Sequence, residues 1–118
     1  MSTLDTPSGL TDAQYDAAIQ AALARIERKV DTWLEDDVID IDTARTGSML
    51  TLTLPNRSQL IINAQPPLHE LWLAARRGGF HFKLDASGQW RDTRHGDEFF
   101  TLLSSCASEQ GGKSGLAF

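Results

Sequence analysis

Apolar residues recur at intervals of three and four positions across residues 11–34, which predicts one long amphipathic helix. Thr11 and Gln14 have the spacing of a capping box, in which each side chain accepts a hydrogen bond from the other residue's backbone N–H. We therefore expect the helix to begin after Thr11 and to end in the acidic segment that follows its stripe. The expected buried stripe consists of Tyr15, Ile19, Leu23, Ile26 and Val30, closed by Trp33 or Leu34.

Alternation of apolar and polar residues then replaces the helical period and predicts strands that each bury one face. Turn-forming residues such as Gly47, Pro55 and Gly88 separate the runs. The short turns exclude the long crossovers that parallel strands need, so we expect an antiparallel meander. The predicted strands are 39–42, 49–54, 60–62, 71–75, 80–84 and a short strand around Trp90.

A second helix is predicted after Asp97 and Glu98, because acids favour the N-terminal end of a helix and an apolar stripe follows them. One face of a single antiparallel sheet can accept the stripes of both helices. The predicted fold class is α+β, a two-layer sandwich with two terminal helices packed on one face of a five- to six-stranded antiparallel sheet. The other face stays open to solvent. The second stripe consists of Phe99, Leu102, Leu103 and Cys106.

A chain of 118 residues is enough for one domain with a single core, which we place at residues 11–107. Residues 1–10 and 108–118 are rich in small and polar residues, and we expect them to be flexible tails. No apolar run approaches the roughly 20 residues of a membrane span, and the N-terminus lacks the pattern of a signal peptide. We therefore expect a cytoplasmic protein.

Charge is distributed unevenly along the chain, although the total is only −5. Residues 1–44 carry ten acids and three bases, whereas residues 45–118 carry six acids and eight bases. The acidic end argues against binding to nucleic acid or to an anionic membrane. Cys106 is the single cysteine, which excludes an internal disulfide and a Cys₄ zinc site. Its place on an apolar stripe predicts a buried thiol rather than a reactive one.

The acids gather most densely between residues 27 and 42, where only Arg28 and Lys29 oppose them. Like charges at helical spacing destabilise a helix, so this density indicates a surface that meets cations or a basic partner. The alternative is a face that is merely solvated. Carboxylates suit hard cations and iron, and the absence of histidine from this stretch predicts weak binding. The seven carboxylates belong to Glu27, Asp31, Glu35, Asp36, Asp37, Asp40 and Asp42.

Trp72 lies between two leucines in a predicted strand, so it should point away from the helices and onto the open face of the sheet. Exposed tryptophans are frequent anchors of protein–protein contacts, and we expect Asn63 and Gln65 to share this surface. The alternative is that Trp72 only packs on neighbours such as Gln65 or Arg77. The three histidines are too scattered in the sequence to form a motif.

Two segments are similar to signatures of the frataxin family, in its bacterial, CyaY-like branch. Residues 63–74, NAQPPLHELWLA, resemble the family's Asn-x-Gln-x-Pro motif followed by Trp-Leu-Ala. Residues 78–82, GGFHF, resemble a Gly-Gly-aromatic-His-Phe turn, and residues 26–33 with residues 40–42 resemble the family's acidic ridge. The likeness extends over residues 12–107 and implies the same sandwich of two helices on an antiparallel sheet.

The resemblance implies a non-enzymatic role in iron–sulfur cluster assembly. Family members bind iron, as Fe²⁺ or Fe³⁺, weakly at the acidic ridge, where other divalent cations can substitute. They dock on the cysteine desulfurase and modulate its delivery of sulfur to the scaffold protein. On this basis all seven carboxylates are candidate metal ligands. The candidate partner contacts are Glu35, Asp36, Asp37, Asn63, Gln65 and Trp72.

The acidic stretch also departs from the family pattern. Arg28, Thr32 and Val38 stand where bacterial relatives carry acids, so the resemblance implies a ridge-like surface rather than a fixed set of ligands. We expect a monomer, with metal-driven oligomers left open.

Two other functions stay open from the sequence. One is an acidic module that docks on a basic partner without binding metal in the cell, and the other is a weak ferroxidase. A hydrolase built on paired carboxylates is disfavoured, because such a pair needs a cleft that separates its two pKa values. The response of docking affinity to iron discriminates between the metal-binding and metal-free alternatives.

Overall fold

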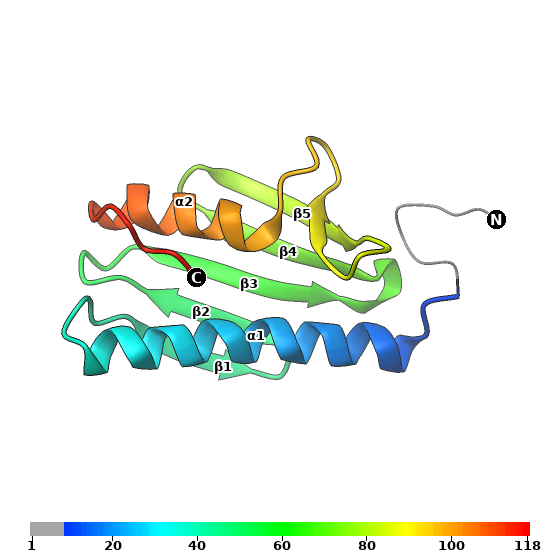
Figure 1. The fold of residues 1–118 in the computed structure, drawn as a ribbon, viewed down its shortest axis with the longest axis horizontal. Helices are drawn as coiled ribbons and strands as arrows, with labels where there is room; N and C mark the ends of the chain where they lie inside the picture. The colour runs from blue at the N-terminus through cyan, green and yellow to red at the C-terminus, as the bar shows by residue number, and fades with distance from the viewer. Residues whose placement is uncertain (1–8) are drawn as a thin grey trace.

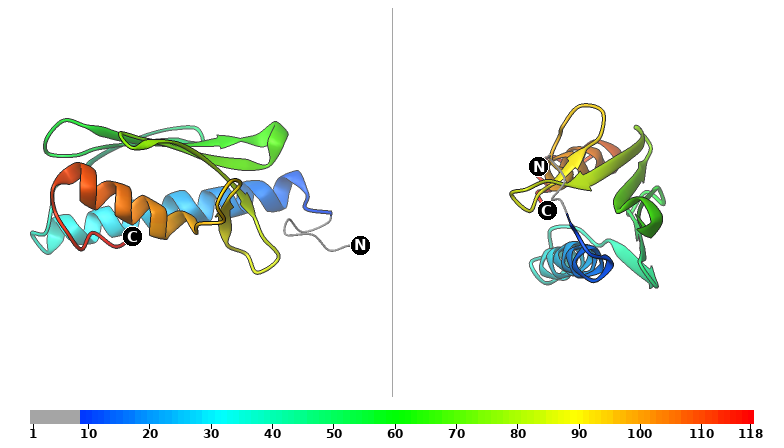
Figure 2. Two further views of the ribbon diagram at one scale, coloured as in Figure 1. Left: turned by 90° about the horizontal axis from the view of Figure 1, so that it is seen from above. Right: turned by 90° about the vertical axis from the view of Figure 1, so that its right-hand side faces the viewer.

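Two helices cover one face of a six-stranded antiparallel sheet in the computed structural model, which describes residues 9–118 (Figure 1). Both helices lie on the same side of the sheet, and the opposite side is uncovered (Figure 2). This arrangement confirms the predicted α+β sandwich. The elements are α1 (Asp12–Glu35), β1 (Asp42–Thr46), β2 (Met49–Thr53), β3 (Gln59–Gln65), η1 (Pro66–Leu68), β4 (Glu70–Ala75), β5 (Gly78–Leu84), β6 (Trp90–Asp92) and α2 (Phe99–Gly111).

Helix α1 begins at the predicted capping box. The Gln14 backbone N–H donates to Thr11 Oγ1 at 3.0 Å, and the Thr11 N–H donates to Gln14 Oε1 at 2.9 Å. The predicted stripe is buried along its whole length, and it is Trp33 that closes it, because Leu34 is 56 % exposed. After Glu35 the backbone of Asp37 takes a left-handed conformation (φ 58°), and the Val38 N–H donates to the Trp33 carbonyl at 2.8 Å. These two features end the helix within the acidic segment.

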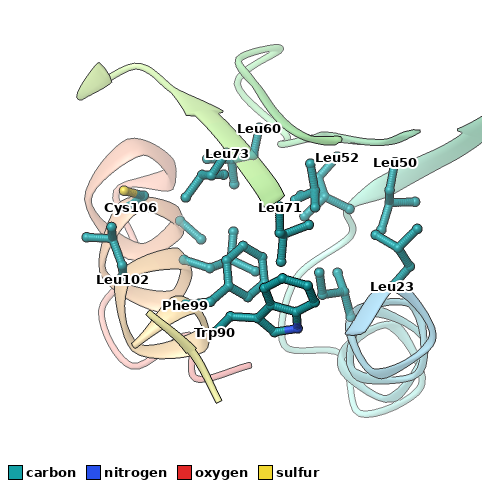
Figure 3. Close-up of a cluster of buried hydrophobic side chains, with 14 of the residues drawn as sticks. Leu23, Leu50, Leu52, Leu60, Leu71, Leu73, Trp90, Phe99, Leu102 and Cys106 are labelled. Carbon is teal, nitrogen blue, oxygen red and sulfur yellow. The ribbon is translucent and has the colours of Figure 1, made fainter. Parts of the chain in front are cut away.

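The strands pair in sequence order, each antiparallel to the next. Side chains on the covered face form the core together with the helix stripes (Figure 3). Leu71, for example, lies opposite Phe82, and both are fully buried. Alternate residues on β2 to β5 therefore face either this core or the open side of the sheet.

Residues 39–41 do not form the predicted strand. β1 begins at Asp42, whose partner Thr53 is the last residue of β2, and the next residue, Leu54, already closes the hairpin by donating to the Ser58 carbonyl at 2.9 Å. Residues 39–41 therefore lack a partner strand. Their alternation instead reflects packing, since Ile41 is buried and Ile39 lies against the core.

The C-terminal segment is more ordered in the structure than the predicted flexible tail over residues 108–118. α2 continues to Gly111, and Gly112, with φ 66°, turns the chain back along the helix. Leu116 is 2 % exposed, and the Phe118 ring packs edge-to-face on Trp33 with 4.8 Å between ring centroids. The segment therefore packs on the core through its apolar side chains, although it is rich in glycine. Residues 1–8, most of the predicted N-terminal tail, lie outside the described residues.

Asp85 organises the turn between β5 and β6. Its Oδ1 accepts hydrogen bonds from the Ser87 N–H, the Ser87 hydroxyl and the Gln89 N–H, and its Oδ2 lies 3.2 Å from Arg91 Nε. These donors, the Ser87 hydroxyl above all, lower the pKa of Asp85 to about 2.

We expect Asp85→Ala to lower the free energy of unfolding by about 1 kcal/mol near neutral pH. Because the folded pKa lies below the ordinary value of 3.8, this stability is present above about pH 4 and is lost as the pH falls towards 2. Urea unfolding of both proteins at pH 7, 5 and 3 measures the difference, which should shrink at pH 3. A difference that stays constant over this range would show that the charge of Asp85 does not contribute.

Candidate functional site

The seven predicted carboxylates lie along one end of the molecule. We call this set of side chains the acidic ridge. It runs from the last turns of α1 through the following link to the first residue of β1 (cyan in Figure 1). Six of its side chains are exposed and make no ion pair within residues 9–118; they belong to Asp31, Glu35, Asp36, Asp37, Asp40 and Asp42.

Glu27 differs from the rest of the acidic ridge. Its Oε1 lies 3.1 Å from Arg45 Nη2, and Arg45 also donates to Gln20 Oε1 from its other terminal nitrogen. Arg45 points to the helix side of β1, so the pair ties the edge strand to α1. Arg45 would therefore compete with a metal ion for the Glu27 carboxylate.

No group of three or more His, Cys, Asp or Glu side chains comes close enough to hold a metal ion anywhere in residues 9–118. The carboxylates of the acidic ridge are spread out rather than assembled. An ion bound there would keep much of its water. Because the carboxylates are not preassembled, we expect a dissociation constant of about a micromolar or weaker.

Trp72 lies on the open face of the sheet, as predicted. The register places Asn63 directly opposite it on β3 and His81 opposite it on β5, while Gln65 lies in the next row of the same face, opposite Glu70. The three predicted contact residues Asn63, Gln65 and Trp72 therefore share one surface. We call it the Trp72 face.

The neighbours that hold Trp72 differ from those expected. Its ring stacks on His81, with 4.1 Å between centroids and 5° between planes, and its Nε1 donates to Glu70 Oε1 at 2.7 Å. Arg77, a predicted packing neighbour, instead pairs with Glu109 and Ser105 on α2. A shallow hollow beside the indole is lined mostly by small or apolar residues, including Ile61, Ala74 and Gly79.

Glu70 and His81 are thus residues that the sequence analysis did not assign to the site. The hairpin between β4 and β5 turns at Arg76 and Arg77, with Ala75 paired to Gly78. Gly78 has φ 151°, a conformation that favours glycine. Counting pairs outward from this turn would have placed His81 against Trp72, but the predicted strand begins only at residue 80, which assigns residues 78 and 79 to the turn.

The remaining candidate groups have structural partners. The Cys106 thiol is 1 % exposed, and burial raises its pKa, which makes it a poor nucleophile. The three histidines do not form one group, because each lies beside a different carboxylate: Asp12 for His69, Glu70 for His81 and Asp92 for His95. No helix in the described part of the chain is long and apolar enough to cross a membrane.

The chain is similar to known proteins in both sequence and structure. A family model described as a frataxin-like domain matches residues 8–113. The iron–sulfur cluster assembly protein CyaY of Paraburkholderia xenovorans (strain LB400) is 48 % identical over 104 residues, which cover 88 % of this chain and 94 % of that protein. A solved frataxin from Psychromonas ingrahamii is 38 % identical, with a TM-score of 0.66 over 84 % of this chain and 92 % of that one.

A more distant structure shares the fold alone. Trimeric frataxin from Saccharomyces cerevisiae, solved in a ferrous complex, is 24 % identical, with a TM-score of 0.63 over 93 % of this chain and 94 % of that one. The family model spans most of this chain, and the CyaY relative matches it at 48 % identity over nearly its full length. The chain belongs to the frataxin family, as a relative of its bacterial CyaY proteins.

Proposed function

We propose that this protein is an adaptor and regulator of iron–sulfur cluster assembly that binds iron weakly on the acidic ridge and docks there on the cysteine desulfurase. The observation that carries the proposal is the set of six exposed carboxylates, which make no ion pair within the described residues, at one end of a chain whose relatives are named iron–sulfur cluster assembly proteins. Its family is one of non-enzymatic assembly proteins. We propose that it acts as a cytoplasmic monomer.

Iron is the cargo in this proposal, and the acidic ridge supplies oxygen ligands for it. Carboxylates accept both Fe²⁺ and Fe³⁺ as well as other divalent cations, so the choice of metal follows availability rather than geometry. Because Glu27 is engaged by Arg45, the six other ridge carboxylates are the stronger candidates. The ferrous complex of yeast frataxin supports iron binding by a protein of this fold.

Docking on the desulfurase follows from the same charges. Six exposed acids on one edge attract a basic surface over a distance of about one Debye length, roughly 8–10 Å at moderate salt. Association should therefore be faster at low salt, and a bound cation on the ridge should weaken or reshape the contact. This shared use of the ridge gives iron a direct means of regulating the docking.

The Trp72 face is a second contact surface in the proposal, and it serves the scaffold protein. It lies on β4, three strands away from the β1 edge that carries the end of the acidic ridge. Two partners can therefore be bound at once without competing for the same residues.

We expect Trp72→Ala to weaken the ternary complex with scaffold and desulfurase by about 2 kcal/mol, roughly thirtyfold in Kd, because buried tryptophans dominate interface energies. The binary complex with the desulfurase should change little. Met49→Ala is the matched control, since Met49 lies in the same row of the open face and is 39 % exposed. Equal losses in both complexes would assign Trp72 a different role.

A second function is an acidic docking module that binds no metal in the cell. The absence of an assembled metal-binding cluster in the described residues favours it. A weak ferroxidase activity is a further alternative, although the same dispersed carboxylates offer no preformed site for oxidation.

An anaerobic titration of backbone amide NMR shifts with Fe²⁺, followed by addition of the desulfurase to the same sample, tests the proposal. Under the leading proposal both additions perturb residues 27–42. If the desulfurase perturbs them and iron does not, the protein is a docking module. If neither does, the acidic ridge is only a solvated surface.

A further inference from the structure

Glu70 is a carboxylate on the open side of the sheet, yet it is only 8 % exposed. It is the first residue of β4 and lies two positions before Trp72, so both side chains are on the same face. Its register partners are Gln65 on β3 and Lys83 on β5. A charge that is this well covered on a solvent-facing surface needs compensating partners, since burying it alone would be unfavourable.

Three nitrogen-bearing side chains surround the Glu70 carboxylate. Oε1 accepts the Trp72 Nε1–H at 2.7 Å and lies 3.7 Å from His81 Nδ1, and Oε2 lies 3.6 Å from Lys83 Nζ. The shortest of these contacts is the one to Trp72. A hydrogen bond from a neutral donor to an ionised carboxylate is stronger than one between neutral groups, so Glu70 holds the edge of the indole firmly.

The backbone of Glu70 is itself fixed to the helix layer. The Tyr15 hydroxyl of α1 donates to the Glu70 carbonyl at 2.5 Å and accepts from the Gln65 N–H at 3.0 Å. Tyr15 is 3 % exposed, so this connection runs through the core. Glu70 therefore holds Trp72 from a rigid base rather than from a mobile loop.

Trp72 is thus restrained on two sides. Glu70 fixes the polar edge of its ring, and His81 supports one face of the ring at 4.1 Å. A side chain that is already ordered loses less conformational freedom when it enters an interface, so restraint raises affinity without adding any contact to the partner.

We propose that Glu70 is a positioning residue, which orients the Trp72 indole so that the scaffold protein meets a preformed anchor. The inference rests on the proposed docking role of Trp72. Glu70 itself makes no contact with the partner and acts only through Trp72. The carboxylates of the acidic ridge differ, because they meet a cation or a partner directly.

The first readout is the indole N–H resonance of Trp72 in a ¹H–¹⁵N NMR spectrum, identified by its loss in Trp72→Phe. We expect Glu70→Ala to shift this resonance and to speed its exchange with solvent by about tenfold, because the N–H loses its acceptor. Glu70→Gln, which keeps an acceptor oxygen, should restore slow exchange. Glu109→Ala is the matched control, since it removes a carboxylate paired with Arg77 on the far side of the hairpin.

The second readout is the affinity of each variant for the scaffold protein in the presence of the desulfurase. We expect Glu70→Ala to weaken binding about fivefold to tenfold and Glu70→Gln to stay within about twofold of the wild type. Glu70→Met, which keeps the volume and lacks the oxygens, replaces Glu70→Ala if the alanine variant unfolds.

Two results would overturn the inference. One is an unchanged indole resonance in Glu70→Ala and Glu70→Met, which would show that Glu70 does not hold the ring. The other is a shifted resonance with wild-type affinity, which would show that the restraint plays no part in docking. Failure of the docking role itself is recognised separately, because Trp72→Ala would then bind the scaffold as tightly as the wild type.

Discussion

Replacing Glu35, Asp36 and Asp37 together by lysine is expected to abolish measurable binding to the cysteine desulfurase while the fold persists. The change reverses three exposed charges at the centre of the acidic ridge. The introduced lysines would repel the basic surface of the desulfurase, which opposes association by several kcal/mol. This corresponds to a loss of affinity of at least about a hundredfold.

The structure indicates how the fold tolerates these changes. None of the three side chains makes an ion pair within residues 9–118, and none is part of the core. Only Asp37 has a special backbone, with φ 58°, where lysine is less favourable than aspartate by about 0.5–1 kcal/mol. That loss is small beside a typical stability of about 5–15 kcal/mol.

Isothermal titration calorimetry at low and at moderate salt measures the binding, and urea unfolding measures the fold. The amide variant Glu35→Gln, Asp36→Asn and Asp37→Asn is the matched control; it removes the charges without reversing them and should retain intermediate affinity. Wild-type affinity of the lysine variant at low salt would refute docking through the acidic ridge.

Phe99→Ala is expected to lower the free energy of unfolding by about 3–5 kcal/mol, the usual result of removing a fully buried ring. Phe99 is 0 % exposed and opens α2, where its ring packs edge-to-face on Phe82 with 5.1 Å between centroids. Figure 3 shows it beside Trp90 of β6, while its ring partner Phe82 lies on β5 and Phe99 itself on α2. The cavity left by alanine would therefore separate three elements at once.

Thermal and urea unfolding followed by circular dichroism measure the effect, which corresponds to a fall in Tm of about 15 °C for a domain of this size. Phe100→Ala is the matched control. Its ring is only partly buried, with the Arg25 guanidinium 3.8 Å from its centroid, so its loss should be clearly smaller. Equal effects of the two substitutions would show that Phe99 is not central to the core.

Periodicity predicted the parts of the fold that depend on local patterns. The capping box at Thr11 and the stripe of α1 could be predicted because a helix end and a helix face are determined by neighbouring residues. The choice between Trp33 and Leu34 at the end of the stripe could not, because it depends on Phe118, which folds back from the other end of the chain to cover Trp33.

The sequence predicted the two surfaces of the candidate site, the acidic ridge and the Trp72 face, but not the side-chain contacts within them. The density of acids predicted the acidic ridge, whereas the pairing of Glu27 with Arg45 depends on how β1 lies against α1. Alternation placed Trp72 on the open face. Its contact with His81 depends on a hairpin register that a displaced turn would change for every residue of the strand.

The strand order also bears on how the chain reaches this structure. Each strand pairs with its neighbour in sequence, so every hairpin closes a short loop at a small loss of conformational entropy. α1 comes first in the chain, yet its contacts lie far ahead; the Tyr15 hydroxyl reaches the Glu70 carbonyl 55 residues later. Because the hairpins close local loops and α1 needs the assembled sheet as its packing surface, we expect the docking of the first helix to be a late event in folding.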